Sequence, residues 1–194
     1  MPESTSGGRE RFVPPKWEKP APLSYGVALE TVSTVAAPLL AGFSLAGSVA
    51  IGQDFDKFRW PGLVVLLLVG AAVLLLSALQ CGFTARRYLY SAADVRDWWP
   101  DVADDSDRER KLRDQQRHDY RRWHHWSGWT RWSYNTGLAV LLLAVAAAVA
   151  PPGGDGAQEA IRWLATGLAV SAAAVQLAWQ PLTSYRRQRS GRRS

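Results

Sequence analysis

Four long stretches of this chain contain almost no charged residues, and they limit what it can fold into. A helix that crosses a bilayer needs roughly 20 mostly apolar residues, because about 30 Å of hydrocarbon must be covered. The stretches that meet this requirement are residues 25–51, 61–83, 134–150 and 161–180. The sequence therefore predicts an all-α membrane protein with four transmembrane helices, arranged as two hairpins.

Charged segments lie before, between and after these spans, and they divide the chain into five regions. We expect a flexible tail over residues 1–24, a first transmembrane hairpin over 25–83 and a charged, helical loop over 84–133. A second hairpin then covers 134–180, closed by Pro181, and a basic tail covers 181–194. The second span is expected to continue as helix to about Val95, before Pro100 breaks it. Pro38 is expected to kink the first span.

The basic residues predict which side of the membrane each region occupies. Four lie in the N-terminal tail, eleven in the loop and five in the C-terminal tail, whereas the two short connections hold only Lys57, Arg59 and Arg162. An even number of spans puts both tails and the loop on one side, and the positive-inside rule makes that side cytoplasmic. Because nearly all of the basic residues are arginine and the chain is rich in alanine, glycine and tryptophan, we expect a bacterial cytoplasmic membrane, with anionic lipid at the basic segments.

Four tryptophans lie three residues apart in "RRWHHWSGWTRW", just before the third span. Trp123, Trp126, Trp129 and Trp132 are typical of a membrane interface, where an apolar ring is buried while its N–H stays hydrated. Base stacking on single-stranded nucleic acid also uses aromatic residues beside cations. However, the adjoining apolar span and the acidic residues of the loop argue against nucleic acid.

The same region contains three residues that could ligate a metal ion. His118 and His125 are seven residues apart on one helix face, and Asp114 lies one turn before His118. These three residues are weak candidate ligands, since their spacing matches no familiar metal motif. We therefore expect no metal, no cofactor and no enzymatic activity, because no catalytic arrangement is found elsewhere in the chain.

Polar residues inside the spans are the strongest functional candidates. Glu30 is an acidic residue within the first apolar stretch, and such carboxylates commonly serve a function. It shares one helix face with small and polar residues, among them Ser33, Ser44 and Ser48. That face either packs closely against another helix or lines a narrow hydrated path. Glu30 is also predicted to form a polar layer near the cytoplasmic side, together with Gln80, Asn135 and Gln176.

The segment "WSYNTGLAVLLLAVAAAVAPP" resembles a recurring feature of uncharacterised actinobacterial multi-pass membrane proteins. The four-span layout is also similar to Orai-type calcium channels and to four-span pore-forming effectors of bacterial defence systems. "LLAGFSLAGSVA" resembles the first Orai span, but Ala50 stands where that family's selectivity carboxylate is expected. These resemblances imply an architecture and no activity.

Two functions follow as hypotheses. The first is a homo-oligomeric pore or ion channel, lined by the small, polar face of the first span. The second is a non-conducting membrane adaptor or sensor, whose charged cytoplasmic loop docks a protein partner.

Overall fold

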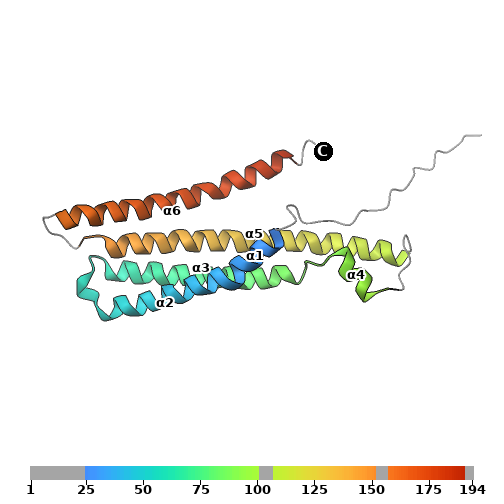
Figure 1. Cartoon of the computed structure of the whole chain (residues 1–194), viewed down its shortest axis with the longest axis horizontal. Helices are drawn as coiled ribbons and strands as arrows, with labels where there is room; N and C mark the ends of the chain where they lie inside the picture. Colours follow the sequence, from blue (N-terminus) through green and yellow to red (C-terminus); the bar gives the residue numbers. More distant parts are fainter. Residues whose placement is uncertain (1–24, 101–106, 152–156, 191–194) are drawn as a thin grey trace, which may run out of the picture.

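The computed structural model describes residues 25–100, 107–151 and 157–190, and its regular elements there are all helices (Figure 1). In chain order they are α1 (Tyr25–Thr31), the π-helical η1 (Val32–Ala36), α2 (Ala37–Gln53), the 3₁₀-helical η2 (Phe55–Lys57), α3 (Pro61–Arg86), α4 (Ala92–Trp98), α5 (Asp107–Val149) and α6 (Ala157–Ser190). Four helices are long and apolar enough to cross a membrane, namely Gly26–Gln53, α3, α5 and Glu159–Ala178. The predicted all-α, four-span fold is confirmed.

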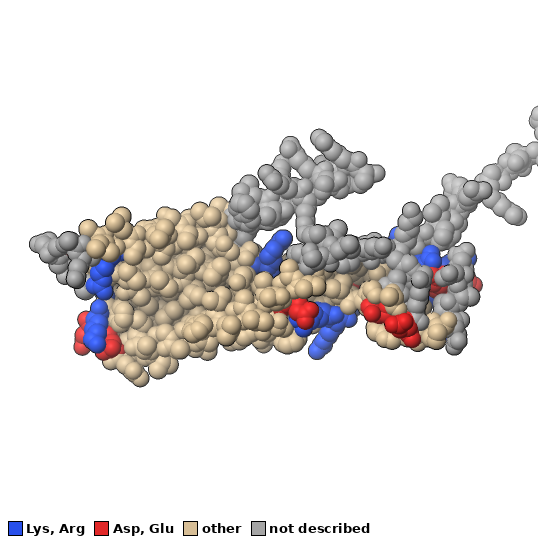
Figure 2. All heavy atoms as spheres, in the orientation of Figure 1, with Lys and Arg blue, Asp and Glu red and all other residues tan. Residues whose placement is uncertain are grey.

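The long helices form a bundle of three, with a fourth helix on one side. The helix α3 packs against both α2 and α5, and α6 packs on α5 (Figure 1). Figure 2 shows a broad band without charged side chains on the face in view, with acidic and basic residues gathered toward both ends of the molecule. Such a band is the surface that a bilayer would cover.

A seam of small and aliphatic residues joins α3 to its neighbours. Seven of the eight buried positions of α3 recur at alternating steps of four and three residues, with Ala72 as the eighth: Val64, Leu68, Ala71, Leu75, Ala78, Gly82 and Ala85. On α5, Trp123, Thr130, Gly137 and Ala144 are buried at steps of seven. A repeat of 3.5 residues keeps one face of each helix against its partner along the whole length.

Two glycines allow this seam to close. A Cβ atom on Gly82 would lie 2.5 Å from the Cβ of Ser33 in η1 and 3.6 Å from the Cγ2 of Thr130 in α5. A Cβ on Gly137 would lie 3.0 Å from the Cγ of Leu75. Three helices therefore meet at Gly82, which is the kind of close approach that small residues permit in lipid.

The first span is irregular before its proline. Instead of one continuous α-helix, it passes through the π-helical turn η1, and α2 then begins with Pro38 in its first turn. Proline tolerates this position because the first amides of a helix have no partner within the helix. The expected disturbance near Pro38 takes the form of this π-helical turn.

Two predicted helix ends were wrong. The helix α3 ends at Arg86, and α4 is a separate helix with Ser91 as its N-cap residue. The second span therefore does not continue as one helix to Val95. The cause is a capping box, in which Ser91 and Asp94 bond each other's backbone amides. At the other end, α6 runs through Pro181 to Ser190. One proline removes one helical hydrogen bond, and the arginines and glutamine that follow favour helix.

Other regional predictions lie outside the described residues. These are the flexible tail at 1–24, the last four residues of the basic tail and residues 101–106 of the loop. The loop and the third span were predicted as separate segments, yet α5 runs as one helix of 43 residues from Asp107 to Val149. It passes through Gly128 without a break.

Candidate functional site

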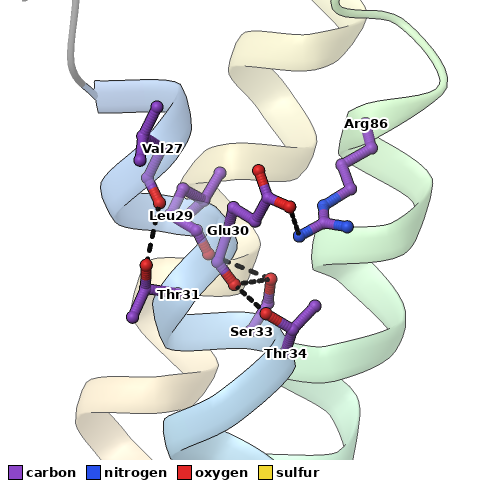
Figure 3. Close-up of polar contacts among 7 residues, drawn as sticks. All are labelled: Val27, Leu29, Glu30, Thr31, Ser33, Thr34 and Arg86. Atoms are coloured by element: carbon purple, nitrogen blue, oxygen red, sulfur yellow. Dashed lines mark hydrogen bonds and ion pairs between the residues drawn. The ribbon is translucent and has the colours of Figure 1, made fainter.

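Glu30 forms an ion pair at the end of the bundle where α3 ends. Its Oε1 lies 3.0 Å from Nη2 of Arg86, with the side chains 57% and 36% exposed, respectively (Figure 3). Arg86 also lies over the ring of Phe83, 5.9 Å from its centroid. The carboxylate therefore has a cationic partner at the edge of the apolar band, and it does not reach the middle of the bundle.

The three serines of the small, polar face point toward the other helices. Ser33 is 2% exposed, Ser44 is 0% exposed and Ser48 is half-buried. Each hydroxyl donates a hydrogen bond to a carbonyl one turn earlier in its own helix, for example Ser33 Oγ to Leu29 O at 2.9 Å (Figure 3). Hydroxyls bonded in this way need no water. The arrangement favours close helix packing, the first of the two alternatives for this face.

The predicted polar layer is only partly assembled. Gln176 of α6 donates a hydrogen bond from Nε2 to Oδ1 of Asn135 in α5, at 3.3 Å. Gln80 instead exposes its side chain on the outer face of α3. Within the described chain, no hydrogen bond joins Glu30, Gln80 and Gln176 to one another, since Glu30 pairs with Arg86, Gln176 bonds Asn135 and Gln80 is exposed.

The four tryptophans have different surroundings. Trp123 is buried, at 2% exposure, and its ring lies 5.1 Å from that of Tyr120. Trp126 is half-buried, whereas Trp129 and Trp132 are 45% and 49% exposed. The rings of the last two meet edge to face, with centroids 5.5 Å apart. Only these two rings expose the surface that an anchor in the membrane interface requires, and their anchoring role stays a prediction.

The candidate metal ligands do not form a site. Asp114, His118 and His125 are all exposed on α5. Among the residues that the structure describes, no group of three His, Cys, Asp or Glu side chains could hold a metal ion.

The N-terminal part of α5 extends far beyond the apolar band. At about 1.5 Å per residue, the 43 residues of α5 span about 64 Å, roughly twice the hydrocarbon thickness. We call residues 107–126 the stalk. One of its faces is exposed and polar, and consists of Asp107, Lys111, Asp114, Gln115, His118, Arg121, Arg122 and His125. This face carries three permanent cations and two carboxylates.

The other face of the stalk is buried and also polar. Glu109 is 5% exposed and Gln116 is 4% exposed. The carboxylate of Glu109 accepts a hydrogen bond of 2.6 Å from Nη2 of Arg113, one turn later. The two faces of the stalk are therefore chemically different, and only the basic one faces outward.

The segment between α3 and α5 is tied to the stalk by a tyrosine. The hydroxyl of Tyr90 donates a hydrogen bond to Oδ2 of Asp119, at 3.0 Å. Burial, followed by this hydrogen bond and the nearby negative charge, raises the pKa of Tyr90 to about 12. The backbone N–H of Ser91 donates to Asp94 at 2.6 Å, and this bond lowers the pKa of the Asp94 carboxyl. The bond from Tyr90 therefore holds the chain just before α4 beside the stalk, and the bond from Ser91 fixes the start of α4 itself.

No family model, curated protein or solved structure matches this chain. Its function must therefore be argued from the residues and their arrangement.

Some of these residues were not singled out from the sequence. Arg86 is 56 positions away from Glu30, and nothing local marks the two as partners. The capping box does have a readable signal, since a serine followed three residues later by an acidic residue is typical of a helix start. Gly82 and Gly137 also carry a signal, because each lies on a face where small residues recur every seven positions.

Proposed function

We propose that this protein is a non-conducting, non-enzymatic membrane adaptor, whose stalk docks an acidic surface of a cytoplasmic protein. In this proposal the four spans lie in a bacterial cytoplasmic membrane, and the stalk and both termini face the cytoplasm. The homo-oligomer predicted from the sequence stays a prediction and is not required.

The observation that carries the proposal is the burial of the small, polar face of the first span. A pore lined by this face would need Ser33 and Ser44 to surround a water-filled axis. In the structure both are nearly inaccessible within a single chain, and Ser33 lies against Gly82 of α3. Opening such an axis would require the seam at Gly82 to separate, which favours the adaptor over the pore.

The stalk supports a docking role by its length and its charge. About 20 residues of helix extend the chain by roughly 30 Å from the apolar band. Their exposed face presents Lys111, Arg121 and Arg122 against the carboxylates of Asp107 and Asp114, which leaves an excess of positive charge. Complementary charge increases association rates and selects among partners more than it adds affinity, as suits a reversible docking surface.

Ion flux into liposomes tests the non-conducting part of the proposal. Purified protein is reconstituted, and the wild type is compared with Glu30→Ala, which removes the carboxylate at the bundle end. We expect no flux above that of empty liposomes with either protein. Flux through the wild type that is lost in Glu30→Ala would instead support the pore.

Crosslinking from the stalk tests the docking part. A photo-crosslinking amino acid replaces the exposed His118, and crosslinked products are compared between the parent protein and Arg121→Glu/Arg122→Glu. Lys57→Glu, at the opposite end of the bundle, is the matched charge control. We expect a discrete soluble protein whose crosslink weakens with added salt and is lost only in the double variant. Crosslinks that are unchanged by charge reversal would contradict the proposal.

A further inference from the structure

The face of α5 that meets α6 continues beyond their last described contact. Thr166 of α6 donates a hydrogen bond to the carbonyl of Ala146 at 3.3 Å, and Gln176 bonds to Asn135. From Asn135 toward the stalk, steps of three, four and three residues on the same face lead to Trp132, Gly128 and His125. These positions are where a fourth helix would pack if it stayed parallel to α5.

The helix α6 does not stay parallel. Figure 1 shows α6 close to α5 near the α5–α6 connection and well separated from it toward the C-terminal end of α6. A hollow of about 450 Å³ lies along this part of α5, and the described residues that line it are His124, His125, Gly128, Trp129 and Trp132. We call it the α5 groove. The space above Gly128 is unfilled, since a Cβ at this position would meet no atom within 4 Å.

The depth of the groove places it at a membrane interface. Thr130, between Gly128 and Trp132, packs against Gly82, which lies one turn before Arg86 at the end of α3. The groove is therefore level with the edge of the apolar band. Exposed tryptophans are favoured at this level, where acyl chains meet headgroups.

The charges around the groove indicate which headgroup it fits. Arg131 is half-buried and borders the groove as the chain neighbour of Trp132, although it is not among the lining residues, and it makes no hydrogen bond or ion pair within the described residues. Arg121 and Arg122 follow along the stalk and are exposed. Two histidines line the groove itself, whereas no acidic residue does so among those described. The positive charge around the groove is complementary to a phosphate group that carries a net negative charge.

We propose that the α5 groove binds one anionic phospholipid of the leaflet on the stalk side. The headgroup phosphate lies near His124, His125 and Arg131, and an acyl chain lies across the edge-to-face rings of Trp129 and Trp132. Basic pockets between transmembrane helices bind acidic headgroups by this chemistry. The groove shares His125 with the exposed face of the stalk, but Gly128 and Arg131, on which its tests depend, lie outside that face, so either proposal can fail without the other.

Native mass spectrometry of the purified protein tests the groove. The wild type is released from nanodiscs that contain phosphatidylglycerol and phosphatidylcholine in equal amounts. We expect one retained phosphatidylglycerol per chain. No retained lipid, or equal retention of both lipids, would overturn the proposal.

Two variants locate the bound lipid. Gly128→Leu projects a side chain into the groove from a position where a Cβ meets no atom within 4 Å, and we expect retention to fall about tenfold, the equivalent of about 1.4 kcal/mol. Gly62→Leu, at the other end of α3 and equally free of neighbours, is the matched control and should retain lipid normally. Equal retention in Gly128→Leu and Gly62→Leu would place the lipid elsewhere and overturn the proposal.

The headgroup charge is tested separately. Arg131→Gln should reduce the preference for phosphatidylglycerol about fivefold, since a cation near an anionic membrane surface contributes about 1 kcal/mol. Arg59→Gln, at the opposite end of the bundle, should leave the preference unchanged. If Arg131→Gln leaves the preference for phosphatidylglycerol unchanged, Arg131 does not contact the headgroup, and the proposed position of the phosphate is wrong. Melting temperatures of all variants report whether the fold is retained.

Discussion

The helix α5 packs against two other long helices, α3 and α6, in different ways. Against α3 it closes a seam in which a methyl group added at Gly137 would meet leucine side chains of α3, and on the other side of this seam a methyl group at Gly82 would meet Ser33 of η1. Against α6 it makes two long hydrogen bonds of 3.3 Å, and Ala173 is the sole buried residue among the described side chains of α6. The first three spans therefore form the rigid unit, and the fourth is attached at its side. This difference leaves room for the α5 groove.

The largest expected effect is at Gly82. Gly82→Ala places a Cβ 2.5 Å from that of Ser33, and neither backbone can yield without moving a helix. We expect a loss of about 3 kcal/mol, the upper range for overpacking a core, measured by thermal unfolding in detergent. Gly70→Ala is the control, because a Cβ there meets nothing within 4 Å. Equal melting temperatures for the two variants would show that the seam is not tightly closed.

A smaller effect is expected at the second glycine of the seam. In Gly137→Ala the new Cβ would lie 3.0 Å from Cγ of Leu75 and 3.2 Å from Cβ of Leu74. A leucine side chain shifts more easily than a backbone, so the loss should be about 1 kcal/mol. The same unfolding assay measures it. A larger loss than in Gly82→Ala would reverse the order of tightness described above.

The next expected effect concerns the hydrogen bond between Tyr90, just before α4, and Asp119 of the stalk. Tyr90→Phe removes the hydrogen bond to Asp119, and we expect the free energy of unfolding to fall by about 1 kcal/mol. Because the pKa of Tyr90 is raised to about 12, this contribution is fully present below the ordinary tyrosine pKa near 10. It is lost as the pH rises through the folded value.

Ultraviolet titration of tyrosinate checks the same contact. The wild type should show one late-titrating tyrosine that is absent from Tyr90→Phe. Identical titration curves in the high-pH range would mean that Tyr90 does not bond Asp119 in solution.

The smallest effect is expected at the fourth span. Gln176→Leu removes the hydrogen bond to Asn135, and such bonds between membrane helices average about 0.6 kcal/mol. Ser171→Ala is the control, since that hydroxyl bonds only its own helix, at Gly167. A loss in Gln176→Leu as large as that in Gly82→Ala would show that α6 belongs to the rigid unit after all.

The four spans could be predicted because hydropathy is a local property of the chain. The helix start at Ser91 was also readable, through Asp94 three residues later, but a continuous helix was predicted across it. The ion pair between Glu30 and Arg86 could not be predicted, since it depends on how two helices are aligned. The same holds for the groove, because no residue of α6 signals the direction in which that helix leaves α5.

The interpretation of Ser33 and Ser44 shows the same limit. Their spacing established that they share one helix face, and it left open whether that face meets protein or water. Only the position of α3, with Gly82 opposite Ser33, decides between these alternatives. Sequence periodicity identifies a face, but the neighbouring helix determines what the face does.

Cysteine labelling tests the membrane arrangement most directly. The chain has one cysteine, Cys81, so Cys81→Ala provides a background for single-cysteine variants at Asp56, in the turn between α2 and α3, and at His118, in the stalk. In intact cells, a membrane-impermeant maleimide should label Asp56→Cys at once and His118→Cys only after permeabilisation. Labelling of both positions from the same side would contradict the account, because α3 would then not cross the membrane.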